Sequence, residues 1–141
     1  MLTQEPASLL IAAIRRRIKQ VIGAQVRELG LTPAQFWVLN RIFEREGMSL
    51  RELAGSLYMD TPTASRVVSA LARMKLARAE ADPEDRRRSR IVATARGRVL
   101  AAKLHGLALE TRAAVEAPLS APEREQLRAL LTKALNHVRT L

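Results

Sequence analysis

The placement of proline constrains the fold of this chain more than any other feature of its sequence. Proline lacks a backbone N–H and interrupts the interior of a helix. The six prolines stand outside the strongly periodic apolar runs, near the expected ends of secondary-structure elements: Pro6, Pro33, Pro62, Pro83, Pro118 and Pro122. The chain is therefore predicted to consist of separate elements of moderate length, divided at these points.

Apolar residues recur at three- and four-residue spacing between these prolines, which is typical of amphipathic helices. The first helix is predicted from about Ala7 to Leu29, with Gly30 as its C-terminal signal. Further helices are expected over about residues 32–46, 49–57, 61–74, 94–117 and 121–138. This pattern predicts a mainly α protein.

Short polar motifs mark the expected helix starts. A Ser or Thr followed three residues later by Glu or Gln predicts a capping box. Three segments fit this pattern: Thr32–Gln35, Ser49–Glu52 and Ser120–Glu123. Asp60 or Thr61 is expected to cap the helix that follows.

The helical period stops after Met74 and resumes at Thr94, and the residues between them favour a β-hairpin. Leu76–Ala81 and Ser89–Ala93 are the predicted strands. The turn between them reads "DPEDRRRSR". Asp82 is expected to form an Asx turn, and the Asp85 carboxylate to order a neighbouring guanidinium.

The charge of the chain indicates a polyanionic partner. Lys and Arg number 24 against 14 acidic residues, so the net charge is +10. Nucleic acid is the expected partner before a membrane surface. Arginines crowded at the hairpin turn repel one another in the free protein, whereas phosphates would stabilise them with release of counterions.

The helix predicted over residues 61–75 has a face suited to a DNA groove. Its apolar residues gather on one side: Ala64, Val67, Val68, Leu71 and Met74. The opposite side carries Ser65, Arg66, Ser69 and Arg73, and Thr61 and Thr63 stand at its start. Small hydroxyl side chains allow close approach to the major groove, and arginine can bind guanine edges or phosphates.

Several classes of protein are not expected. There is no cysteine, which excludes disulfides and thiolate metal sites. His105 and His137 stand apart from other metal-ligating residues, so no metal is expected. No phosphate-binding loop or nucleophile motif is present, which argues against an enzyme or a cofactor. Without a secretion signal or a membrane span, a cytoplasmic location and no membrane partner are expected.

The order of these elements resembles the MarR family of transcriptional regulators over nearly the whole chain. "DPEDRRRSRIVATARG" (Asp82–Gly97) is similar to the wing signature of that family. "LTPAQFWVL" and "SLRELAGSLYMDTPTASRVVSAL" resemble its second helix and its helix-turn-helix. Lys75, Ala79 and Ala93 depart from the family pattern, in which glycine, arginine and leucine are usual.

The resemblance implies one domain over residues 1–141, which is a homodimeric winged helix-turn-helix protein. Residues 31–93 would form the winged helix-turn-helix, and about 1–30 and 94–141 the dimerisation helices. The apolar residues of both terminal helices exceed what one small domain needs to cover, which also favours a homodimer on a pseudo-palindromic operator. The expected DNA-contacting residues are Thr61, Thr63, Ser65, Arg66, Ser69, Arg73, Arg86, Arg87, Arg88 and Arg90.

Members of the family also suggest a small anionic or phenolic ligand, for which Arg16, Arg17, Phe36 and Trp37 are the candidate residues. The resulting hypothesis is a sequence-specific, ligand-responsive repressor that binds double-stranded DNA. The alternative is an architectural protein that binds nucleic acid without sequence preference. The charge fits both, whereas the polar face of the helix over residues 61–75 favours the first.

Overall fold

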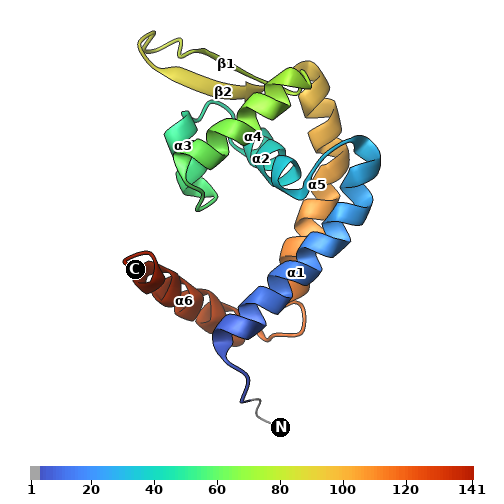
Figure 1. The fold of residues 1–141 in the computed structure, drawn as a ribbon, viewed down its shortest axis with the longest axis vertical. Coiled ribbons are helices and arrows are strands. Elements are labelled where there is room, and N and C mark those ends of the chain that lie inside the picture. The colour runs from blue at the N-terminus through green and yellow to red at the C-terminus, as the bar shows by residue number, and fades with distance from the viewer. Residues whose placement is uncertain (1–3) are drawn as a thin grey trace. The chain divides into compact units, whose positions relative to one another are not determined.

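The protein is described by a computed structural model over residues 4–141, and it is mainly helical with one β-hairpin (Figure 1). The elements are α1 (Ala7–Val26), η1 (Arg27–Leu29), α2 (Pro33–Glu44), α3 (Leu50–Ser56), α4 (Thr61–Arg73), β1 (Ala77–Ala81), β2 (Ser89–Ala93), α5 (Ala95–Glu116) and α6 (Ala121–Val138). The predicted helices and hairpin are therefore confirmed. No helix within residues 4–141 is long and apolar enough to cross a bilayer.

The chain forms two compact units, one ending at Leu109 and one comprising Glu110–Leu141. The boundary falls inside α5, so the second unit contains the end of that helix and all of α6. The organisation as one domain over residues 1–141 stays a prediction.

The core of the first unit is formed by aliphatic side chains and one phenylalanine from its helices and hairpin. Ile22 of α1, Phe36 of α2, Leu53 of α3 and Leu71 of α4 are all at most 1% exposed. Full burial of such a side chain stabilises the fold by about 1.5–3 kcal/mol. This shared core fixes α2, α3 and α4 as one body, and α4 is the helix whose polar face was predicted to contact DNA.

The helix starts largely follow the predicted caps. The side chains of Thr32 and Gln35 each bind the other's backbone N–H at 3.1 Å, which makes a full capping box. Ser120 and Glu123 form a second box. The box expected at Ser49 is only half formed, which corrects that prediction. Ser49 accepts the Glu52 N–H at 3.1 Å, but the Glu52 carboxylate pairs with Arg88 instead.

The junction between α4 and β1 is a tight turn closed by hydrogen bonds. Lys75 adopts a left-handed conformation with φ of 60°. The Lys75 N–H donates to Ala72 O at 2.9 Å, and the Leu76 N–H donates to Leu71 O at 2.9 Å. These two bonds form a Schellman motif, in which glycine normally takes the left-handed position. The helix thus ends with a strained lysine in the position that usually holds glycine.

The start of α5 is attached to this same turn. Thr94 Oγ1 donates to Lys75 O at 2.7 Å and accepts the Gly97 N–H at 3.0 Å. The Thr94 N–H donates to Leu76 O at 3.1 Å. Gly97 lies so close to the Leu76 carbonyl that a Cβ atom there would stand 1.9 Å from its oxygen. The end of α4 and the start of α5 are therefore locked together by backbone contacts.

The two strands pair antiparallel, with Ala77 opposite Ala93 and Glu80 opposite Arg90. We call this hairpin and its turn the wing (residues 77–93), and its turn, Asp82–Arg88, the wing tip. Met48 forms a β-bridge with Ile91, and the Gly47 N–H donates to Ile91 O at 3.1 Å. The loop between α2 and α3 thereby holds the middle of β2.

Candidate nucleic-acid interface

A chain of hydrogen bonds organises the start of α4. Asp60 caps the helix, with its Oδ1 accepting the Thr63 N–H at 2.7 Å. The Thr63 hydroxyl donates to Asp60 Oδ2 at 2.9 Å and accepts from Arg66 Nη2 at 3.2 Å. The Thr63 N–H bond is the main reason that the pKa of Asp60 lies below its usual value, with the nearby Arg66 charge adding to the effect. Arg66 is thus held over the first turn of α4.

The two faces of α4 differ as the sequence predicts. Ala64 and Leu71 are fully buried. On the other side Ser69 and Arg73 are exposed, and Ser65 is half-buried. Arg73 has no ion-pair partner within residues 4–141. A polar surface with hydroxyl groups and two arginines therefore faces away from the core.

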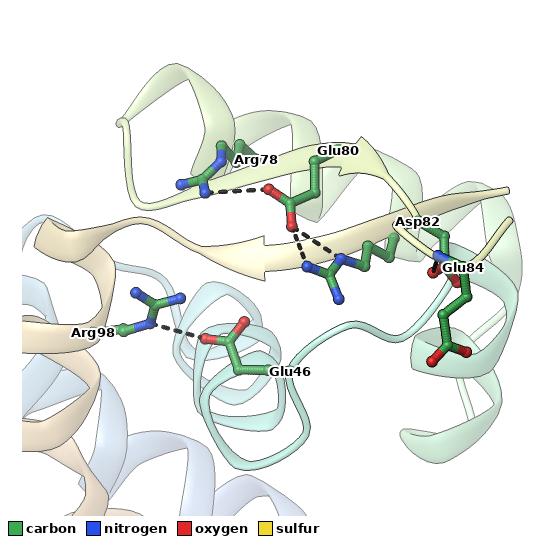
Figure 2. Close-up of polar contacts among 7 residues, drawn as sticks. Glu46, Arg78, Glu80, Asp82, Glu84 and Arg98 are labelled. Atoms are coloured by element: carbon green, nitrogen blue, oxygen red, sulfur yellow. Dashed lines mark hydrogen bonds and ion pairs between the residues drawn. The ribbon is translucent and has the colours of Figure 1, made fainter. Parts of the chain in front are cut away.

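Aspartates hold the wing tip through the backbone. Asp82 Oδ1 accepts the Glu84 N–H at 2.9 Å, which confirms the predicted Asx turn (Figure 2). Asp85 Oδ1 accepts the Arg87 N–H at 3.1 Å. The sequence suggested that Asp85 would order a guanidinium, but this bond goes to the backbone. Two successive Asx turns therefore fix the backbone of the wing tip.

Three of the five wing arginines have carboxylate partners in the protein. Arg90 donates to Glu80 Oε1 from Nε at 2.9 Å and from Nη2 at 2.6 Å. Figure 2 shows that Glu80 also accepts a hydrogen bond from Arg78, at 3.2 Å. These arginines, Arg90 first, lower the pKa of Glu80. Arg88 pairs with Glu52 of α3.

The other two wing arginines have no such partner. Arg86 and Arg87 are exposed, and neither side chain is hydrogen-bonded or ion-paired within residues 4–141. They differ in this from Arg88 and Arg90, which follow them in the chain. The wing tip therefore presents two adjacent arginines whose guanidinium groups have no carboxylate partner within residues 4–141.

Sequence reasoning missed the acids that organise this surface. Glu80 was detectable, since the hairpin register places it directly opposite Arg90. Glu52 was assigned to a helix cap, and nothing local in the sequence links it to Arg88. Glu46 also escaped notice; its carboxylate accepts from Arg98 Nε at 3.1 Å (Figure 2).

The residues expected to bind a small ligand separate into different environments. Trp37 lines a cavity of about 310 Å³, with Arg15 and Lys19 as its cationic residues. Phe36 lies in the core at 1% exposure, edge-to-face with Trp37 at 4.8 Å between ring centroids, so it does not line this cavity. Arg16 lines a neighbouring groove. Arg17 borders neither of the two.

The histidines show no metal-binding arrangement. His105 Nδ1 lies 3.1 Å from Asn40 Oδ1, and the ring packs on Phe43. The Asn40 amide also donates to Glu44 at 2.9 Å, which satisfies this buried polar side chain. Within residues 4–141 no three acidic or histidine side chains are grouped to hold a metal ion.

The helix pair α3–α4 followed by a two-stranded wing defines a winged helix-turn-helix protein. The model of the MarR family matches residues 29–88, which span α2, α3, α4 and most of the wing. The chain belongs to the MarR family of transcription regulators.

Solved structures of similar proteins cover almost the whole chain. The crystal structure of S. aureus MepR in its DNA-binding conformation has 27% identity and a TM-score of 0.85, over 95% of this chain and 99% of that one. The MepR–DNA complex has the same identity and coverage, with a TM-score of 0.81. A probable transcriptional regulator from Pseudomonas aeruginosa has 31% identity, a TM-score of 0.68, and coverage of 92% and 97%. No curated protein matches this chain.

Proposed function

We propose that this protein is a sequence-specific repressor that binds double-stranded DNA as a homodimer. The observation that carries the proposal is the set of arginines with no carboxylate partner on α4 and at the wing tip. Both surfaces belong to the unit that ends at Leu109. A similar protein, MepR, has been crystallised as a DNA complex.

In this proposal α4 enters the major groove. Thr61, Thr63, Ser65 and Ser69 allow the helix to approach the bases, and Arg66 and Arg73 bind guanine edges or phosphates. The bond from Arg66 to Thr63 supports a positioned Arg66, because its guanidinium is already directed along the outer face. A positioned arginine loses less side-chain entropy when it binds.

The wing supplies contacts of a different kind. Arg86 and Arg87 bind phosphates or enter the minor groove, since no carboxylate competes for them. Arg88 and Arg90 remain candidate contacts, but each must exchange Glu52 or Glu80 for a phosphate. We therefore rank Arg86 and Arg87 first among the wing residues.

Homodimerisation is supported by exposed apolar side chains on both terminal helices. On α1 they are Leu9, Leu10, Ile11, Ile14 and Val21, each 38–47% exposed. On α6 they are Leu130, Leu131 and Val138, each 41–56% exposed, and α6 contains no buried residue. Exposed apolar residues in such number usually mark a surface that binds another protein.

A dimer would read a pseudo-palindromic operator with half-sites about 34–36 Å apart. Sedimentation equilibrium at micromolar concentration is expected to give twice the chain mass of 15.7 kDa. A monomer under these conditions would contradict this part of the proposal.

We further infer that a small anionic or phenolic ligand binds beside Trp37. The indole offers an apolar surface, and Arg15 and Lys19 line the same cavity as cations. Trp37→Phe and Lys19→Gln are expected to weaken the release of DNA by a probe such as salicylate. A response to salicylate that neither substitution changes would contradict this assignment.

Selection of bound fragments from random double-stranded DNA tests the main proposal. A palindrome is the expected result. On the selected site, Arg66→Ala or Arg73→Ala should each cost about 1–3 kcal/mol, with a smaller effect on random DNA. Lys133→Ala removes a charge from α6 and is the matched control, for which no loss of sequence preference is expected.

The alternative of an architectural protein rests on the net charge of +10 and the free arginines of the wing tip. It predicts no enriched motif in the selection. It also predicts that Arg66→Ala and Arg87→Ala weaken cognate and random DNA to the same extent. That outcome would replace sequence-specific repression with general nucleic-acid binding.

A further inference from the structure

A groove separate from the Trp37 cavity lies on the unit that ends at Leu109. It has a volume of about 440 Å³ and is bordered by η1, the residue that precedes β1, and the first half of α5. Its lining residues are Leu29, Leu76, Arg96, Val99, Leu100 and Lys103. None of them belongs to the proposed DNA interface or to the ligand cavity beside Trp37.

The floor of this groove is apolar and accessible. Val99 is 61% exposed and Leu29 is 44% exposed, although both are large aliphatic residues. Leu76, between them and the core, is 2% exposed. Covering exposed aliphatic surface stabilises a complex through the hydrophobic effect. The groove therefore suits the apolar body of a ligand.

Two cations flank this floor on α5. Arg96 and Lys103 are seven residues apart, which is two helical turns and about 10 Å along the axis. Val99 and Leu100 lie between them on the same side of the helix. Neither cation has a carboxylate partner within residues 4–141, whereas the nearby Arg98 is paired with Glu46. No acidic residue lines the groove.

We propose that this groove binds an amphipathic carboxylate. The apolar chain of the ligand lies along Leu29, Val99 and Leu100, and its carboxylate binds Arg96 or Lys103. The volume falls within the range of about 300–1,000 Å³ that is usual for small-molecule sites. The two cations, Arg96 and Lys103, favour a negatively charged ligand. The apolar floor between them favours a ligand with an extended apolar chain over a compact one.

The position of the groove gives such a ligand access to the end of α4. Leu76 is both a wall of the groove and the residue whose N–H closes the Schellman motif on Leu71. Its carbonyl accepts the Thr94 N–H at the start of α5. A ligand that contacts Leu76 therefore contacts the junction between α4 and the wing.

Titration of the full-length protein with decanoate, followed by two-dimensional ¹H–¹⁵N NMR in the absence of DNA, tests the proposal. Saturable shifts are expected at the amides of Leu29, Leu76 and Val99. Decanol, which has the same chain without the charge, should bind at least threefold more weakly. Because no DNA is present, this result does not depend on the proposed function.

Substitutions separate this groove from the cavity beside Trp37. Arg96→Gln and Lys103→Gln should each weaken decanoate binding roughly three- to tenfold, as expected for a lost charge-assisted contact at an accessible site. Arg15→Gln is the matched control at the Trp37 cavity and should leave the shifts unchanged.

Three outcomes would overturn the proposal. The first is the absence of saturable shifts up to about 1 mM decanoate, a concentration at which even weak binding of a small molecule is detected. The second is equal binding of decanol and decanoate. The third is that a second copy of the chain covers Val99 and keeps decanoate away from it, in which case the groove is part of a subunit interface.

Discussion

Replacement of Gly97 by alanine tests how tightly α4, the wing and α5 are joined. Gly97 is buried in the first turn of α5. An added Cβ would stand 1.9 Å from the Leu76 oxygen and 2.8 Å from its carbonyl carbon. Real Cβ atoms essentially never come within 3.0 Å of another atom in this way. The backbone must therefore move by more than 1 Å, because the obstacle is a carbonyl and not a flexible side chain.

The cost follows from the bonds that this carbonyl and its neighbours make. Leu76 O accepts the Thr94 N–H at 3.1 Å, and Thr94 Oγ1 donates to Lys75 O at 2.7 Å. Each bond contributes about 0.5–1.5 kcal/mol, and overpacking costs about 1–3 kcal/mol. We therefore expect Gly97→Ala to lower the free energy of unfolding by roughly 3 kcal/mol or more. That is a large part of the usual total of about 5–15 kcal/mol.

Urea unfolding followed by circular dichroism at 222 nm, at one protein concentration, measures this difference. Gly106→Ala is the matched control, because Gly106 is in the same helix and a Cβ there would meet nothing within 4 Å. Alanine is favoured over glycine in a helix by about 1 kcal/mol, so the control should be neutral or stabilising. A Gly97→Ala protein as stable as the control would refute the reasoning about this junction.

Three further outcomes are expected. Lys75→Gly should raise the free energy of unfolding by up to about 1 kcal/mol in the same urea assay, because glycine adopts φ of 60° without strain; a loss of stability would contradict this. Glu52→Gln should tighten DNA binding by up to about 1 kcal/mol, measured by fluorescence anisotropy at one salt concentration, because Arg88 no longer has to leave Glu52 before it binds a phosphate; weaker binding than that of the unchanged protein would speak against this. Since the pKa values of Asp60 and Glu80 are lowered in the folded protein from their usual 3.8 and 4.5, their stabilising contribution is present above those values and is lost as the pH falls through the folded values. Asp60→Asn should therefore flatten the dependence of the urea midpoint on pH below about 3.8, the usual pKa of Asp60.

Most of the fold was predictable because its signals are local. Helix starts depend on a side chain and an N–H three residues away, as at Thr32 and Ser120, and both of these predictions are confirmed. The hairpin was predicted because the helical spacing of apolar residues stops after Met74 and resumes at Thr94, and the structure confirms it. The two faces of α4 followed from its apolar spacing.

The features that sequence reasoning missed depend on contacts between distant residues. Glu52 satisfies the local pattern of a capping box, yet it pairs with Arg88, which comes 36 residues later. A rule that considers only neighbouring residues cannot decide whether Glu52 completes the cap or pairs with Arg88. Near Trp37, the sequence offered Arg16 and Arg17 as candidate ligand residues, whereas the cations that line the cavity are Arg15 and Lys19. Which side of α1 faces Trp37 depends on the packing of one helix on another, which no local pattern specifies.

The ion pairs of the wing arginines explain how a crowded group of positive charges can stand in an ordered hairpin. The four arginines between Arg86 and Arg90 would repel one another, but Glu52 and Glu80 neutralise two of them, Arg88 and Arg90. The Arg88–Glu52 pair is about half exposed, with side-chain exposures of 45% and 50%. Such pairs contribute about 0–1 kcal/mol. Glu52 can therefore orient the wing in the free protein and still yield Arg88 to a phosphate at small cost, while Arg86 and Arg87 need no exchange at all.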